Sequence, residues 1–204
     1  DLYDRMYDFS SFNDWVTFAD FGESFPSENG RAYIVQRNGW DYGEWGTWDY
    51  GYIREINLFI ERATAATALS ETDKARFIAE GRFLRASYYF EMTKRMGGVP
   101  LITESLLYDF KGDPTYLQKP RAKESEMYDF VISEAEAIKD ALPSDVNQKG
   151  RATKAAALAM EARAALYAGA IAKYGASTPQ VSLPGGEVGI DAGLANGYYT
   201  KALA

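Results

Sequence analysis

The sequence predicts an all-α fold, an α-solenoid of helix pairs with long irregular loops between them. Two observations predict it. A shift of 78 residues aligns two segments with helical patterning, so that Arg85 matches Arg163. The segments that precede them align under the same shift, with Tyr50 on Tyr128. Tandem helix pairs that bury their apolar faces against one another are typical of tetratricopeptide-like repeats.

The first 46 residues do not fit this repeat. They are rich in Asp, Phe, Trp, Tyr and Gly, and we expect a helix followed by an irregular, aromatic loop in residues 1–46. Residues 47–204 then hold the tetratricopeptide-like repeats, and the whole chain forms one structural domain.

The first helix pair is expected at residues 47–66 and 72–96. Ser70 and Asp73 can form a capping box at the start of the second helix, because their side chains reach free N–H groups of the first turn. Gly97 and Gly98 supply the left-handed geometry that ends a helix, and Pro100 prevents its continuation.

The second helix of this pair is expected to have an apolar face and a polar face. Phe83, Ala86 and Phe90 share one side at helical spacing, whereas Arg82, Arg85 and Tyr89 share another. The arginines are expected to pair with an acidic residue in a structural role, and the candidate partners are Glu55, Glu80 and Glu91.

The second pair is expected at residues 123–142, ended by Pro143, and at residues 152–174, capped by Gly175. The second of these helices is rich in alanines that allow close helix packing: Ala156, Ala159, Ala162, Ala164, Ala165 and Ala168. Residues 175–196 have no helical periodicity and are expected to form a long loop, after which a truncated third repeat begins near Asn196.

Composition excludes several classes of function. A net charge of −7 argues against nucleic-acid binding, which needs clustered Lys and Arg. The chain has no Cys and no His, so we expect no zinc site, no cysteine nucleophile and no histidine-based triad. We expect no metal and no cofactor. We also expect no transmembrane helix, because the apolar runs are short and interrupted. A chain that starts at Asp1 is expected to be a processed or truncated product.

Four stretches together resemble the SusD/RagB family. ARFIAEGRFLRASYYFEMTKRMGGVPLITE resembles the family's A-E-A-[KR]-F-L-R-A-x-Y-Y-F helix and F-G-G-V-P-L turn, with Gly81 and Met96 in place of Ala and Phe. WDYGYIREINLFIE, EMYDFVISEAEAIKDALP and GRATKAAALAMEARAALYAG resemble three further helices of the family. The resemblance covers roughly residues 18–204.

This resemblance implies a lipoprotein on the outer face of the outer membrane that delivers glycans, or in some members peptides, to a SusC-type TonB-dependent transporter. It implies no catalysis. The lipid-bearing N-terminal Cys and the C-terminal part of the family are missing from this chain. The helical repeats would form a scaffold, and loops outside them would hold the ligand.

NGWDYGEWGTWDY, residues 38–50, is the candidate ligand-binding stretch. Flat aromatic rings match the C–H face of a pyranose, and nearby polar side chains can bond its hydroxyl groups. Trp40, Tyr42 and Trp45 are candidates for such a platform, with burial in the core as the alternative. Trp48 and Tyr52 have helical spacing and are expected to pack inward.

Three polar residues are further candidates for ligand binding. Asp41 lies between the platform rings. Asp20 lies in FADFGE, which resembles a segment where family members often have a ligand-facing acid. Arg31 could bond hydroxyl groups from the same side.

Two other functions stay open. A glycoside hydrolase would use two carboxylates beside aromatic rings, and Asp41, Glu44 and Asp49 could supply them, although no specific signature supports this. A helical-repeat scaffold, or a peptide-binding member of the RagB type, would instead bind a protein segment in the groove of the repeats.

Overall fold

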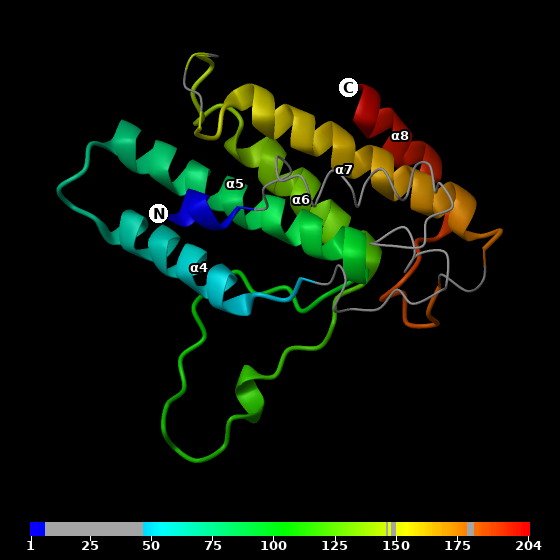
Figure 1. Cartoon of the computed structure of the whole chain (residues 1–204), viewed down its shortest axis with the longest axis horizontal. Helices are drawn as coiled ribbons and strands as arrows, with labels where there is room; N and C mark the ends of the chain where they lie inside the picture. The colour runs from blue at the N-terminus through cyan, green and yellow to red at the C-terminus, as the bar shows by residue number, and fades with distance from the viewer. Residues whose placement is uncertain (7–46, 146, 148–149, 179–181) are drawn as a thin grey trace, which may run out of the picture.

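A computed structural model describes residues 1–6, 47–145, 147, 150–178 and 182–204. The α-helices in this part are α4 (Tyr50–Ala65), α5 (Glu71–Met96), α6 (Glu124–Ile138), α7 (Lys154–Gly175) and α8 (Ala195–Leu203). Short 3-10 turns form η1 (Leu2–Arg5), η2 (Thr115–Leu117) and η4 (Ala192–Leu194). The helices lie side by side in chain order, α4 with α5, then α6 with α7, then α8 (Figure 1). The predicted all-α repeat of helix pairs is confirmed.

The start of α5 agrees with the sequence to within one residue, because a capping side chain marks it, whereas α4 begins at Tyr50 and not at the predicted residue 47. Ser70 Oγ accepts the Asp73 N–H at 3.1 Å, as predicted. Asp49 and Thr153 cap α4 and α7 in the same way. A polar side chain that satisfies a free N–H of the first turn leaves a recognisable pattern in the sequence.

Some of the predicted helix ends were wrong. Helix α6 ends at Ile138, so Pro143 lies beyond it and does not terminate it. Gly175 belongs to the last turn of α7, and the capping residue Ala176 keeps right-handed geometry at φ −61°. Gly97 has the predicted positive φ of 70°, but Gly98 is not among the positive-φ residues.

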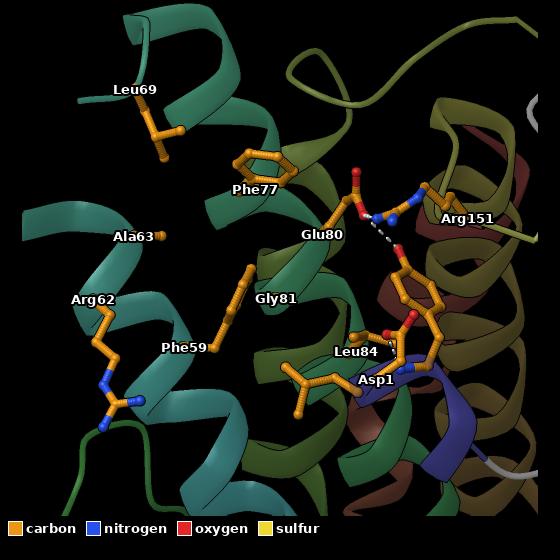
Figure 2. A pocket seen from close by; sticks show the side chains of 12 residues that line it. Asp1, Phe59, Arg62, Ala63, Leu69, Phe77, Glu80, Gly81, Leu84 and Arg151 are labelled. Atoms are coloured by element: carbon orange, nitrogen blue, oxygen red, sulfur yellow. Dashed lines mark hydrogen bonds and ion pairs between the residues drawn. The ribbon is translucent and has the colours of Figure 1, made fainter. Parts of the chain in front are cut away.

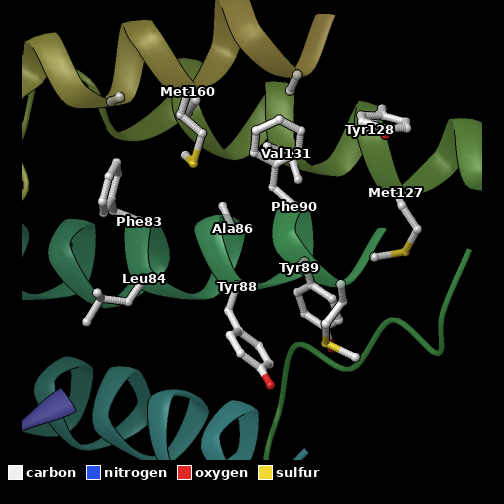
Figure 3. Close-up of a cluster of buried hydrophobic side chains, with 14 of the residues drawn as sticks. Phe83, Leu84, Ala86, Tyr88, Tyr89, Phe90, Met127, Tyr128, Val131 and Met160 are labelled. Carbon is white, nitrogen blue, oxygen red and sulfur yellow. The ribbon is translucent and has the colours of Figure 1, made fainter. Parts of the chain in front are cut away.

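Helix α5 lies at the centre of the core. Figure 3 shows Phe83, Ala86 and Phe90 pointing toward α6 and α7, while Leu84 and Tyr88 point toward α4. The predicted apolar face is thus confirmed, and a second apolar face packs on α4.

Helix α7 packs between α6 and α8. Ala164, Ala165 and Ala168 are fully buried there, as predicted, but Ala159 is exposed. At Gly169 a Cβ atom would lie 2.9 Å from the Tyr199 ring, so the two helices approach closely.

Helix α7 is also long and apolar enough to cross a bilayer by length and composition, contrary to the expectation from apolar runs. Buried core helices meet the same criterion, and 44% of its most apolar stretch is buried inside the molecule. The predicted division at residue 46 stays a prediction, because residues 7–46 lie outside the described part.

Candidate ligand-binding site

The chain after α5 turns back along α4 and α5 in an extended segment, residues 97–105, which we name the return segment. Tyr89 fixes its middle, because the Tyr89 hydroxyl donates to Ile102 O at 3.0 Å and accepts from Ile102 N at 2.8 Å. Asn57 Nδ2 donates to the carbonyl oxygens of Ile102 and Glu104. Burial raises the pKa of Tyr89 to about 12, so this hydroxyl keeps its proton and can donate to Ile102 O even in alkaline solution.

Arg85 joins the return segment to the next helix pair. Its guanidinium donates to Asn57 Oδ1 at 2.9 Å and to Thr103 O at 2.8 Å. It also donates to Glu134 Oε2 of α6 at 3.1 Å. Arg85 is only 6% exposed, and its contacts support a structural role.

The predicted acidic partners of the two arginines were wrong. Arg82 and Arg85 both bind Glu134, and neither binds Glu55, Glu80 or Glu91 in the described contacts. Glu134 is about fifty positions away along the chain and comes close only because α6 packs on α5.

The return segment leads into residues 106–118, which we name the aromatic loop. In Figure 1 it projects below α4, away from α6, α7 and α8. Tyr108, Phe110 and Tyr116 are exposed on it, Phe110 to 87%. The Tyr108 and Phe110 rings meet edge to face at 5.0 Å between centroids.

Hydrogen bonds within the aromatic loop give it a defined shape. The Tyr116 hydroxyl accepts from Asp109 N at 2.6 Å and donates to Leu107 O at 2.9 Å. Phe110 has a φ of 58°, a conformation that side chains other than glycine seldom adopt. Sequence reasoning missed this surface, although LLYDFKGDPTYL (residues 106–117) mixes aromatic residues with Gly, Pro and Asp without helical periodicity.

Residues 47–49 connect the predicted platform to α4. The Asp49 N–H donates to the Tyr88 hydroxyl at 3.0 Å, and Thr47 Oγ1 lies 2.9 Å from the same hydroxyl. Arg5 forms an ion pair with Asp49 at 2.5 Å. Asp49 therefore caps α4 and balances Arg5, which are structural roles.

Trp48 does not pack inward as predicted. It is 42% exposed, and its ring meets Tyr50 edge to face at 5.4 Å. Helical spacing does not apply to Trp48, because it precedes the capping residue Asp49. Tyr52, inside the helix, is buried as predicted.

The six candidate ligand-binding residues all lie outside the described residues, so their proximity stays a prediction: Asp20, Arg31, Trp40, Asp41, Tyr42 and Trp45. Glu44, of the alternative catalytic pair, lies there too. Within the described part of the chain, no group of three or more acidic residues is arranged to hold a metal ion.

Comparisons with known proteins agree with one another. A family of proteins described as "Starch-binding associating with outer membrane", of the SusD-like type, matches residues 10–166. A SusD-like protein of Bacteroides ovatus is 32% identical over 116 residues, which is 55% of this chain and 20% of the relative.

Two solved structures are also similar. A SusD-like protein from Bacteroides fragilis is 36% identical, with a TM-score of 0.52 over 63% of this chain and 24% of that one. A laminarin-binding SusD-like protein is 25% identical, with a TM-score of 0.52 over 79% of this chain and 32% of that one. The chain thus spans between a fifth and a third of the length of these relatives.

Proposed function

Because the chain belongs to the SusD-like family of starch-binding proteins that associate with the outer membrane, we propose that it is part of a non-catalytic protein that captures glycans at the cell surface. The family match over residues 10–166 is the observation that supports this most directly. A similar structure named for laminarin binding supports a carbohydrate ligand.

The glycan would bind to the aromatic stretch before α4. Exposed Trp48 extends the series of Trp40, Tyr42 and Trp45 to the first helix of the scaffold. Stacking on flat rings excludes water from the C–H face of a sugar, while carboxylates and guanidinium groups bond its hydroxyl groups. The polar groups would be Asp20, Arg31 and Asp41.

Capture at the surface needs a route inward. The protein would be held in the outer membrane by a lipid on a part of the protein that precedes this chain. It would pass oligosaccharides to a SusC-like TonB-dependent transporter, which performs the uptake. The helix pairs would serve as a rigid support for the loops on which glycan and transporter act.

One observation favours a second candidate function, the capture of a peptide or protein segment. Leu107 and Phe110 on the aromatic loop are exposed and lack hydrogen-bonding side-chain groups. Apolar anchors of this kind suit pockets of a protein partner.

Affinity electrophoresis of the full-length protein through gels with laminarin, starch or a matched inert polymer tests glycan capture. We expect retardation by one polysaccharide, and its loss in Trp40→Ala, Trp45→Ala or Trp48→Ala. Tyr174→Ala, which removes an exposed ring on α7, is the matched control and should migrate as the wild type. A folded protein that no polysaccharide retards would contradict glycan capture and favour the capture of a peptide.

A further inference from the structure

The aromatic loop presents its rings to solvent. Phe110 is 87% exposed, Tyr116 is 46% exposed and Tyr108 is 38% exposed. In Figure 1 the loop projects away from α6, α7 and α8, so these helices do not cover the rings. Tyr108 meets Phe110 edge to face, and the high exposure of Phe110 means that this contact leaves most of its ring accessible to a ligand.

Hydrogen bonds from the backbone hold the two tyrosine rings in place. The Tyr108 hydroxyl accepts the Gly112 N–H at 3.1 Å. The Tyr116 hydroxyl accepts from the Asp109 N–H and donates to Leu107 O. Each ring is therefore fixed both through its own backbone and through its hydroxyl group. A surface that is ordered before binding loses little conformational entropy when a ligand packs on it.

Two charged side chains of the loop are also open to solvent. The Lys111 side chain is 84% exposed and the Asp109 side chain is 43% exposed, with 3.6 Å between Lys111 Nζ and Asp109 Oδ2. The Lys111 N–H donates to Asp109 Oδ1 at 3.1 Å, which orients the carboxylate. An exposed ion pair of this kind contributes little to stability. Lys111 can therefore donate to a ligand, and Asp109 can accept from it.

A sugar fits this set of groups. A pyranose has an apolar C–H face that can lie on the Phe110 ring, and hydroxyl groups that donate and accept hydrogen bonds. A ligand with a single charge would be repelled by either Lys111 or Asp109. A lipid surface would have to bury the exposed carboxylates of Asp109 and Asp113, which is costly. The loop thus favours a neutral ligand that is rich in hydroxyl groups.

We propose that the aromatic loop is a second glycan-binding site, separate from the stretch before α4. One sugar ring stacks on Phe110, and its hydroxyl groups bond to Lys111 and Asp109. This inference rests on the proposed function, because it assigns another site for the same class of ligand. The loop offers fewer rings than the stretch before α4, so it binds more weakly and does not by itself retard the protein in a gel.

Fluorine NMR of the full-length protein, with 4-fluorophenylalanine introduced only at Phe110, tests the proposal during titration with maltohexaose and laminarihexaose. We expect a saturable shift of the signal with one of the two oligosaccharides. Trp40→Ala combined with Trp45→Ala should leave this shift intact. The same label at Phe77, which lines a cavity between α4 and α5 (Figure 2), is the matched control and should not shift.

Three variants separate a flat ring from an apolar side chain, with affinity measured by calorimetry in the Trp40→Ala and Trp45→Ala background. Phe110→Leu keeps the position apolar but removes the ring, and the affinity should fall about tenfold, as expected for one aromatic contact. Phe110→Trp enlarges the ring face and should bind at least as tightly. Leu107→Ala removes the exposed apolar neighbour and should leave the affinity unchanged.

The outcomes distinguish this site from the proposed function. Retardation by a polysaccharide without a shift at Phe110 overturns the loop site and leaves the proposed function standing. A shift at Phe110 in a protein that no polysaccharide retards supports the loop site and contradicts capture at the stretch before α4. Equal affinity with and without Phe110→Leu overturns the glycan site on the loop and favours the capture of a protein segment there.

Discussion

Arg82 and Arg85 differ in their surroundings although both bind Glu134. The Arg82 side chain is partly exposed, whereas Arg85 is buried and also holds Asn57 and Thr103. An ion pair that is exposed to water contributes little to stability. Removing one partner of a buried ion pair is costly, because the other charge stays buried with neither its partner nor water around it.

Arg85→Ala is therefore expected to lower the free energy of unfolding by about 3 kcal/mol. Arg82→Ala, its matched control, is expected to cost about 1 kcal/mol or less. Urea unfolding followed by circular dichroism measures both. Equal costs for the two variants would contradict the role assigned to the buried network.

Tyr89 links stability to alkaline pH. Burial raises its pKa to about 12 in the folded protein, while an unfolded tyrosine has a pKa of about 10. Above pH 10 the unfolded chain loses this proton and the folded protein keeps it, so the free energy of unfolding falls as pH rises toward 12. The expected slope is about 1.4 kcal/mol per pH unit for each such tyrosine.

Urea unfolding at a series of pH values between 9 and 11.5 checks this slope, and Tyr89→Phe should make it shallower. Tyr3 and Tyr52 also have a pKa raised by burial to about 12, so part of the slope should remain in the variant. A slope identical to that of the wild type would mean that Tyr89 ionises equally in both states.

At the scale of elements, two glycines at or just beyond the C-terminal ends of α5 and α7 have different surroundings. An added Cβ at Gly98 would lie 1.9 Å from Ala122 O, where the return segment passes the start of α6. At Gly175, in the last turn of α7, nothing lies within 4 Å of an added Cβ. The first position has no space for a side chain, and the second has no need of glycine.

Gly98→Ala is expected to destabilise the protein by about 2 kcal/mol or more, because backbone must move. Gly175→Ala is expected to stabilise it by about 0.5 to 1 kcal/mol, since alanine favours a helix more than glycine does. Thermal unfolding of both variants measures the difference. A loss of stability in Gly175→Ala would show that this end of α7 needs glycine after all.

Helices were predictable from the sequence where the determinant is local. Ser70 caps α5 through a residue three positions away, and Phe83 and Phe90 fall on one face by spacing alone. The partner of Arg85 was not predictable, because Glu134 comes close only through the packing of α6. The exposure of Trp48 was not predictable either, because it depends on where α4 begins, and α4 begins only two residues after Trp48.

At the scale of the whole molecule, the outer face of α7 and α8 is an apolar surface that no helix of the described part covers. Leu166, Tyr199 and Leu203 border a hollow there, together with Ala162 and Ala202. Exposed apolar patches of this kind mark interaction surfaces.

The 204-residue chain on its own is thus expected to self-associate as its concentration rises. Leu166→Lys combined with Leu203→Lys should keep it monomeric, while Leu107→Lys on the aromatic loop serves as the control. Light scattering coupled to size-exclusion chromatography measures the mass. A wild-type chain that stays monomeric throughout would contradict this expectation.

The candidate site was less predictable than the fold. Helical repeats rest on local contacts that recur along the chain, so a single sequence contains most of the information. A sugar-binding platform depends on how loops pack against those helices, and no periodicity in the sequence predicts that arrangement. A cavity between α4 and α5 illustrates this, because Phe77 and Glu80 lie on a helix that the sequence predicts, while the space that they enclose with Phe59 of α4 arises from packing.

Both ends of the aromatic loop are tied to the helices. Ser105 donates to Glu61 of α4 through its N–H and its hydroxyl, at 2.7 Å each, and these bonds lower the pKa of the Glu61 carboxyl. Arg121 donates to the carbonyl oxygens of Met96 and Gly98 at 2.6 Å. The loop can therefore change length or sequence while the repeats keep their register, since lengthening a surface loop costs little.

This arrangement makes the tip near Gly112 a natural insertion point. Sequence changes at this tip can replace the exposed surface of the aromatic loop without changing how the helices pack. The loop can therefore vary in sequence while the stability of the helical scaffold is kept. A laboratory can use the same tolerance: an epitope or a fluorophore-binding peptide placed after Gly112 would test whether the protein is displayed on living cells, with the scaffold left unchanged.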